Sequence, residues 1–213
     1  MPLTTPRIRT PRRDATENRE ALILAAATVL NADPSASLEA VATEAGLSRR
    51  AFYGHFATRD ALLAEVALHG AARINRAMLT GAPDEEPRVP ATDLALVGAR
   101  LWDEVDHVRS MALMTVRGPH AHLVGDALLP LRRHVLRIVA RGVADGSFRT
   151  DIEVGRLARL VESAAISVLD ESTRHPMSTS EGRRLVVLSV LAMVGFGQAD
   201  ATAILTTIQK ARA

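Results

Sequence analysis

The sequence predicts an all-α fold, and both the composition and the spacing of apolar residues lead to it. Of the 213 residues, 47% are hydrophobic but only 3% are aromatic, so alanine, leucine and valine must fill the core. β-sandwiches usually draw more on aromatic and threonine-rich strands. Leu22, Ala26, Val29 and Leu30 recur at i, i+4, i+7 and i+8, which places them on one face of a helix.

Capping and stop signals divide the first third of the chain into four expected helices. Pro34 ends the first, because proline cannot continue a helix. Ser37 and Ser48 suit the N-caps of two short helices, and Gly46 suits the left-handed position after a helix end. Thr58 begins a longer helix with an acidic residue in its first turn. The four helices are expected at about residues 15–32, 38–45, 49–56 and 59–79.

A linker rich in proline and acidic residues is expected at 81–90, before a helical second half. The longest apolar stretch, 185–197, has about 13 residues where a membrane span needs about 20. It therefore predicts a buried core or interface helix. The helices of the second half are expected at about 91–107, 109–118, 123–145, 151–173, 180–197 and 199–211.

The excess of positive charge lies in the first third of the chain. Residues 1–80 carry ten arginines against eight acidic residues, whereas residues 81–213 carry sixteen of each sign. The windows 1–13 and 46–59 contain no acidic residue, and such basic patches are what phosphate contacts require. With its prolines and arginines, segment 1–14 is expected to be a disordered basic arm, which either stays idle or enters a minor groove of DNA.

Composition excludes several classes of function. The absence of cysteine removes disulfides, thiolate metal sites and cysteine nucleophiles. His120 and His122 lack an acidic partner at a metal-site spacing, so no metal or other cofactor is expected. Without a Gly-x-Ser-x-Gly turn or a phosphate loop, we do not expect an enzyme. The chain opens with polar residues instead of an apolar signal segment, so we expect it in the cytoplasm.

Two short helices joined by residues 45–48, the second rich in arginine, have the layout of a helix-turn-helix. Gly46 supplies the tight turn, and Leu47 is expected to fill the space between the helices. Phe52 and Phe56 fasten one face of the second helix, which leaves its polar and basic face free. The pattern therefore predicts a segment that binds DNA.

Three short runs carry a family resemblance: residues 38–48 read LEAVATEAGLS, 52–56 read FYGHF and 59–63 read RDALL. With them, the chain resembles the tetracycline-repressor (TetR) family, although Leu30 stands where phenylalanine is common. The resemblance implies a three-helix DNA-binding domain, linked through a long fourth helix to a helical domain that binds a ligand and forms the dimer. The domains are expected at residues 15–60 and 61–213.

The resemblance also assigns roles in DNA binding to single residues. In that family the third helix lies in the major groove. The resemblance therefore implies that Arg49 and Arg50 reach base edges. Other readings stay open: the two arginines as a solvated helix end, Tyr53 as a surface aromatic, and His55 packed beside Phe56. The residues expected to bind phosphates are Ser48, Tyr53, His55 and Arg59.

The second half is expected to hold a dimer interface and a ligand site. Wide apolar faces at 151–173 and 180–197 would pair with those of a second copy, because a monomer has no evident use for them. The residues of these faces are Leu157, Leu160, Val161, Ala164, Val168, Leu185, Leu188, Leu191 and Val194. The ligand-site candidates are Trp102, His107, Met111, Met114, Arg117, Glu162 and Asp170.

These observations predict a sequence-specific transcriptional regulator. It is expected to be a homodimeric repressor that binds a palindromic operator in double-stranded DNA and is released by a small molecule. Two alternatives stay open: a regulator that senses no small molecule, and an architectural protein that binds DNA without sequence preference.

Overall fold

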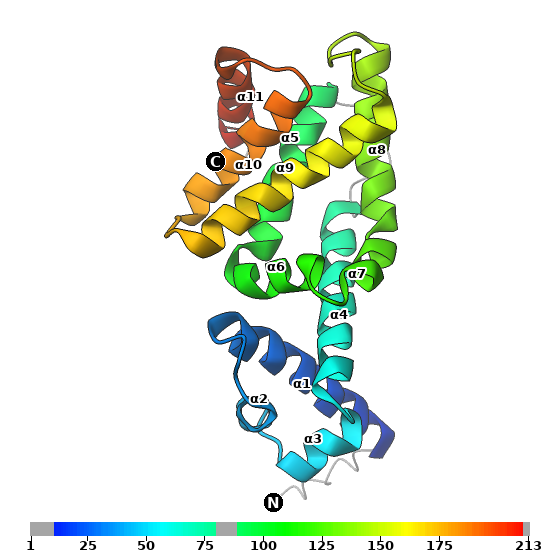
Figure 1. Cartoon of the computed structure of the whole chain (residues 1–213), viewed down its shortest axis with the longest axis vertical. Coiled ribbons are helices and arrows are strands. Elements are labelled where there is room, and N and C mark those ends of the chain that lie inside the picture. The colour runs from blue at the N-terminus through cyan, green and yellow to red at the C-terminus, as the bar shows by residue number, and fades with distance from the viewer. Residues whose placement is uncertain (1–10, 80–88, 211–213) are drawn as a thin grey trace, which may run out of the picture.

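The computed structural model describes residues 11–79 and 89–210, and within these ranges every regular element is a helix. Figure 1 shows two tiers: α1, α2 and α3 lie below, α5 to α11 lie above, and α4 runs between them. The all-α prediction is therefore confirmed. The bounds are α1 Pro11–Ala32, α2 Leu38–Glu44, α3 Arg49–His55, α4 Arg59–Leu79, α5 Pro90–Val105, the 3₁₀-helix η1 Asp106–Val108, α6 Arg109–Arg117, α7 Ala121–Ala127, α8 Leu129–Ala144, α9 Val154–Arg174, α10 Thr179–Met193 and α11 Gln198–Lys210.

Local capping starts the short helices of the lower tier. The hydroxyl of Ser37 accepts the N–H of Ala40 at 3.1 Å, and that of Ser48 accepts the N–H of Ala51 at 3.1 Å. Each cap satisfies a backbone donor that the first turn of a helix leaves unpaired. Gly46 follows α2 with φ +69°, a left-handed conformation that a side chain would strain.

The lower tier has its own hydrophobic core, and Arg19 on α1 fastens it. Phe52 and Phe56 are buried with their ring centroids 5.9 Å apart. The Arg19 guanidinium lies 4.3 Å from the centroid of the Phe56 ring and donates to the carbonyl of His55 at 3.0 Å. It also pairs with Glu65 of α4 at 3.0 Å. One side chain thus connects α1, α3 and α4, which fixes the pose of α3.

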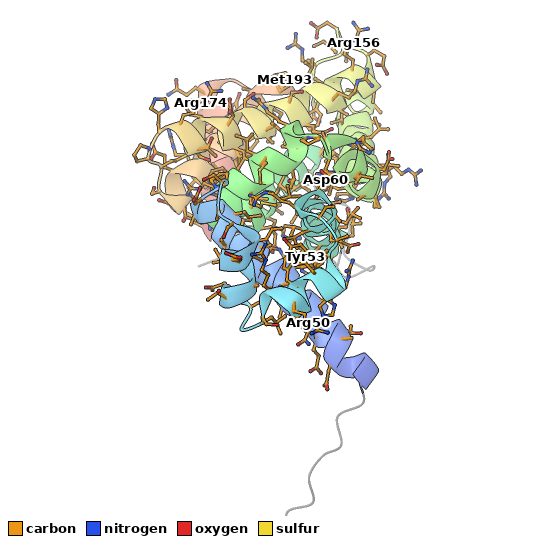
Figure 2. The ribbon with its side chains drawn as sticks, turned by 60° about the horizontal axis from the view of Figure 1, so that its bottom comes forward. Arg50, Tyr53, Asp60, Arg156, Arg174 and Met193 are labelled. Atoms are coloured by element: carbon orange, nitrogen blue, oxygen red, sulfur yellow. The ribbon has the colours of Figure 1, made fainter. Side chains whose placement is uncertain are left out.

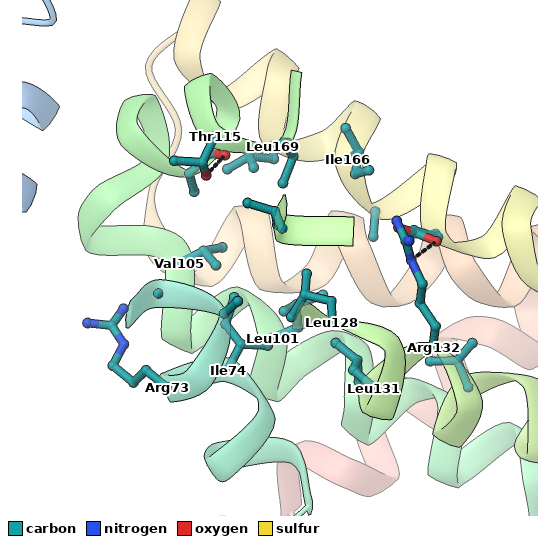
Figure 3. A pocket seen from close by; sticks show the side chains of 18 of the residues that line it. Arg73, Ile74, Leu101, Val105, Thr115, Leu128, Leu131, Arg132, Ile166 and Leu169 are labelled. Carbon is teal, nitrogen blue, oxygen red and sulfur yellow. Dashed lines mark hydrogen bonds and ion pairs between the residues drawn. The ribbon is translucent and has the colours of Figure 1, made fainter. Parts of the chain in front are cut away.

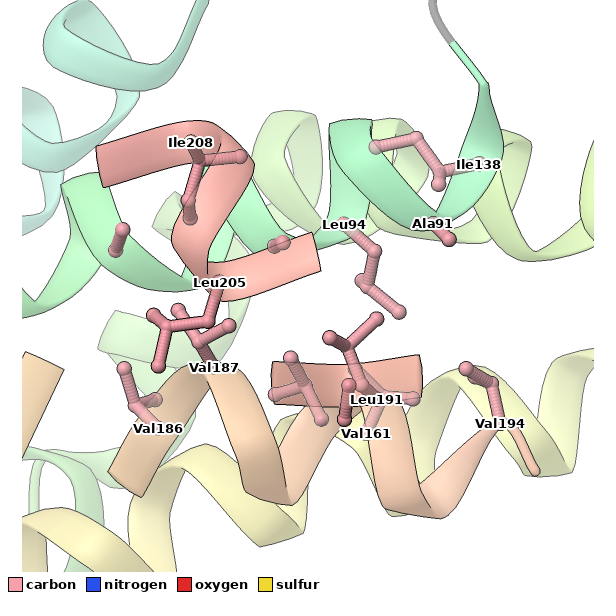
Figure 4. Close-up of a cluster of buried hydrophobic side chains, with 14 of the residues drawn as sticks. Ala91, Leu94, Ile138, Val161, Val186, Val187, Leu191, Val194, Leu205 and Ile208 are labelled. Atoms are coloured by element: carbon pink, nitrogen blue, oxygen red, sulfur yellow. The ribbon is translucent and has the colours of Figure 1, made fainter. Parts of the chain in front are cut away.

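Helix α10 lies in the middle of the upper tier, against α5, α9 and α11. Figure 4 shows the buried side chains of this core, among them Leu94 of α5, Val187 and Leu191 of α10 and Leu205 of α11. No helix within the described ranges is long and apolar enough to cross a membrane.

The start of the first helix differs from the expectation. Helix α1 begins at Pro11, so residues 11–14 are helical and do not belong to the arm expected at 1–14. Proline suits a first helical turn, where its missing N–H would have no partner. The rest of that arm, and residues 81–88 of the expected linker, lie outside the described residues.

The single helix expected at 123–145 is also wrong, because the structure has two helices, α7 and α8, which separate at Leu128. Pro130 explains the break. Within a continuous helix its ring would clash with the carbonyl four residues earlier, whereas the first turn of α8 accepts it.

The chain itself covers part of the apolar faces that were expected to pair two copies. Leu157 and Val161 of α9, and Leu191 and Val194 of α10, are at most 3% exposed. Helices α5 and α11 pack on α10 and account for much of this burial. The argument that a monomer has no use for these faces is therefore wrong.

Candidate nucleic-acid interface and cavity

Helix α3 lies at the end of the molecule farthest from the upper tier and turns polar side chains outward. Figure 2 looks toward this end and shows Arg50 and Tyr53 on α3. On the opposite face of the helix, Phe52 is 1% exposed and anchors α3 in the core. A rigid helix with a basic outer face has the geometry that a major groove accepts.

The two arginines at the start of α3 differ in how they are held. Arg49 is 67% exposed and forms an ion pair with Glu39 of α2, and its guanidinium lies 5.7 Å from the centroid of the Tyr53 ring. Tyr53 packs edge-on against Phe52, with the ring centroids 5.5 Å apart. Arg50 is exposed and forms no ion pair or hydrogen bond with any residue that the structure describes. Arg50 therefore has its full set of donors available.

The other residues expected to bind phosphates lie near α3 but already make contacts within the chain. Ser48 caps α3 through its hydroxyl, and His55 is half-buried. Arg59, at the start of α4, donates to the carbonyls of Ala36 and, at 2.7 Å, of Pro34. It thereby holds the link between α1 and α2 against α4. The sequence reasoning missed this role, because the contact joins residues more than twenty positions apart.

We expect Arg59→Ala to lower the free energy of unfolding by about 1 kcal/mol, because two charged hydrogen bonds to backbone carbonyls are lost. Urea unfolding measures this, with Arg50→Ala as the control that leaves stability unchanged. If Arg59 also binds a phosphate, the same variant lowers the salt slope of DNA binding by about one unit. An unchanged unfolding midpoint would show that the contact does not stabilise the fold.

Residues 22–66 match the family model described as "Bacterial regulatory proteins, tetR family". This segment of the chain is similar to the DNA-binding domain of the TetR family. The matched residues run from α1 through α2 and α3 into α4, and α3 is the helix at the recognition position of the helix-turn-helix.

Solved structures of low sequence identity share the whole fold. FadR from Bacillus subtilis, in complex with stearoyl-CoA, has a TM-score of 0.69 at 12% identity over 83% of this chain and 97% of its own. RolR, in complex with resorcinol, has 0.61 at 18% over 91% and 95%. A tetR-family regulatory protein from Rhodococcus RHA1 has 0.64 at 21% over 85% and 98%. No curated protein sequence matches the chain.

A cavity of about 420 Å³ lies mainly in the upper tier, and α1 of the lower tier contributes Ile23, Leu24 and Ala27 to its lining. Figure 3 shows its wall, to which α4 contributes Ile74, α5 Leu101, α8 Leu131 and α9 Ile166. Most of the lining side chains are aliphatic. A cavity of this size and character suits a small molecule that is largely hydrocarbon.

Only part of the expected ligand site lies at this cavity. Trp102, Met111 and Glu162 line it. Trp102 is 2% exposed, and its indole N–H donates to the carbonyl of Thr179 at 3.0 Å. The other four candidates do not line it: His107 is exposed, Met114 packs on the core of the lower tier, and Arg117 pairs with Asp170 at 3.4 Å.

Two polar contacts join the tiers next to this cavity. The side-chain oxygen of Asn31, at the end of α1, accepts the N–H groups of Ser110 at 3.0 Å and Met111 at 3.3 Å. A residue of the DNA-binding domain thus caps α6, whose Met111 lines the cavity. Farther along, His120 Nε2 lies 3.0 Å from Asp60 Oδ1, which links the loop after α6 to the start of α4.

Proposed function

We propose that this protein is a repressor that leaves its operator when a small molecule enters the cavity of the upper tier. The observation that carries the proposal is that helices in contact with the DNA-binding domain, α4 and α6, also line the cavity. Helix α4 follows α3 directly and lines the cavity through Val66, Gly70 and Ile74. Helix α6 also lines it and is capped by Asn31 from the lower tier. A molecule that displaces α4 or α6 would therefore move the DNA-binding domain.

The side chains of α3 and of the start of α4 are assigned roles in DNA binding according to how exposed they are. Arg50 and Arg49 would read base edges, since arginine grips guanine O6 and N7 with two hydrogen bonds. Tyr53, Ser48, His55 and the remaining donors of Arg59 would contact phosphates. The structures of FadR with stearoyl-CoA and of RolR with resorcinol support a small-molecule ligand for this protein as well.

We propose a homodimer that binds a palindromic operator in the cytoplasm. Two recognition helices about 34 Å apart, or a multiple of this, would enter successive major grooves. The half-buried Leu160 and Ala164 of α9 and Leu188 of α10 are the candidates for the contact between copies. Sedimentation at micromolar concentration should give a dimer, and a monomer that binds a palindrome tightly would contradict this assembly.

The test is selection of bound duplexes from a random DNA pool, followed by release with a panel of small molecules. We expect enrichment of one palindromic sequence and its loss from the complex with at least one compound. Enrichment without any release would favour a regulator that senses no small molecule. If the protein binds DNA with no sequence preference at moderate ionic strength, the proposal of an operator-specific regulator fails. The result would then favour an architectural DNA-binding protein.

We expect Asn31→Ala to weaken the response to ligand more than it weakens operator binding. The variant removes the acceptor that caps α6 and the donor to the carbonyl of His107 at 3.2 Å, while α3 keeps its contacts. The measurement is the ligand concentration that halves operator binding, which should rise severalfold. Thr28→Ala is the matched control, because its hydroxyl contacts only the carbonyl of Leu24 within α1. An identical response in the two variants would exclude coupling through Asn31.

A further inference from the structure

The cavity opens between α8 and α9. Among its lining residues, those that are exposed lie on these two helices, apart from Leu24 of α1. On α8 they recur at the spacing of one helix face, and α9 contributes two lining residues with little or no side chain, Gly155 and Ala158. The exposed lining residues of α8 and α9 are Leu129, Arg132, Arg133, Leu136 and Arg159, which we call the mouth.

The mouth is basic. Three arginines and one carboxylate, Glu162, line this part of the cavity. Arg132 binds that carboxylate with Nη2 at 2.6 Å and Nε at 3.0 Å. A dashed line at Arg132 in Figure 3 marks this contact. Arg132 also donates to the carbonyl of Gly125 at 3.1 Å. Arg132 and Glu162 are therefore already engaged with each other.

Arg133 and Arg159 are the charges at the mouth that remain available. Neither side chain forms an ion pair or hydrogen bond with any residue in the described ranges. The acidic side chain near Arg159 is Glu153, whose oxygens accept the N–H of Gly155 at 2.6 Å and of Arg156 at 2.7 Å. Those backbone bonds, and then the nearby arginines, lower the pKa of Glu153. Glu153 is committed to capping α9, which leaves Arg159 free to bind another anion.

Away from the mouth, the lining arginine and hydroxyl are already engaged, and His69 of α4 is the remaining basic side chain. Arg73, which also lines the cavity, donates to the carbonyl of Glu104 at 2.6 Å and pairs with the Glu104 carboxylate at 3.4 Å. The hydroxyl of Thr115 donates to the carbonyl of Ala112 at 2.8 Å. A charged group deep in this cavity would lose its water and find no free arginine there, which is costly.

From this distribution we propose that the effector is an anionic amphiphile, with its hydrocarbon part inside the cavity and its carboxylate or phosphate between Arg133 and Arg159. This inference rests on the proposed function and adds the chemical class of the ligand. Arginine binds either anion with two parallel hydrogen bonds, so both are included.

The experiment measures binding of four probes with the same ten-carbon chain: decanoate, decyl phosphate, decanol and decyltrimethylammonium. Trp102 is the single tryptophan of the chain and lines the cavity, so its fluorescence reports occupancy. Each probe is used well below its micelle concentration. We expect decanoate or decyl phosphate to bind about tenfold more tightly than decanol, since each exposed arginine contributes modestly. High salt should reduce this difference.

Variants assign the preference to the mouth. Arg133→Ala combined with Arg159→Ala should abolish the difference between decanoate and decanol while decanol affinity stays unchanged. Arg184→Ala, at an exposed position of α10 that does not line the cavity, should keep the difference. Equal binding of decanol and decanoate to the parent protein, or tightest binding of decyltrimethylammonium, would overturn the proposal.

Operator binding is measured on the same preparations. If the protein selects an operator and decanol binds as well as decanoate, the ligand class is wrong and the regulator stands. If no duplex is preferred, the proposed function fails whatever the probes show.

Discussion

Gly182→Ala is expected to lower the free energy of unfolding by about 3 kcal/mol, the largest effect on stability that we predict. Gly182 lies in the first turns of α10, where a Cβ would come within 1.9 Å of Cζ2 of Trp102. The indole is rigid and buried, and its N–H is bound to Thr179, so it cannot simply turn aside. Overpacking of this kind typically costs 1–3 kcal/mol, and this site lies at the upper end.

Urea unfolding of three variants tests this explanation. Gly70→Ala is the matched control, because nothing lies within 4 Å of its added Cβ and alanine favours a helix interior by about 1 kcal/mol. Gly182→Ala with Trp102→Leu should recover part of the loss, since the smaller side chain removes the clash. If Gly182→Ala matched Gly70→Ala, the close packing of α10 on α5 at this point would be refuted.

The second large effect is expected on DNA. Arg50→Ala should cost about 1–3 kcal/mol of operator affinity and relax specificity at one base position. Arg50 is exposed at the outer end of the molecule and is not engaged by another described side chain, so the substitution should leave the fold unchanged. Binding to an operator library and to random DNA gives the two affinities.

A fall of equal size on operator and random DNA would instead make Arg50 a phosphate contact. Glu39→Gln is the informative comparison, because it releases Arg49 from its ion pair while Arg50 is untouched. It should change preference at a different base position from that affected by Arg50→Ala.

The lower tier could be predicted in detail because local chemistry determines it. Ser37, Ser48 and Gly46 act on groups within a few positions of themselves, so capping rules locate α2 and α3 to within a residue. Pro130 was an equally local signal for the break between α7 and α8.

The cavity and the long-range contacts of Asn31 and Arg59 could not be predicted in this way. Leu101 and Ile166 line the cavity with the same kind of side chain that fills the core, so sequence spacing does not separate the two. Asn31 and Arg59 act on partners far along the chain. The burial of Leu191 depends on α5 and α11 packing on α10, which the apolar pattern of α10 alone does not reveal.

Because α4 is one continuous helix, a small rotation at the cavity produces a larger displacement at its DNA-binding end. Its 21 residues form one rod of about 32 Å at 1.5 Å per residue, and Gly70, which touches the cavity, lies about 16 Å from Arg59 at the DNA end. If the rod pivots near Gly70 by about 10°, its lower end swings by about 3 Å. That displacement is comparable to the 3.4 Å rise of one base step. Under the proposed function, a tilt of α4 by about 10° on ligand binding would therefore shift α3 by about one base step relative to the DNA.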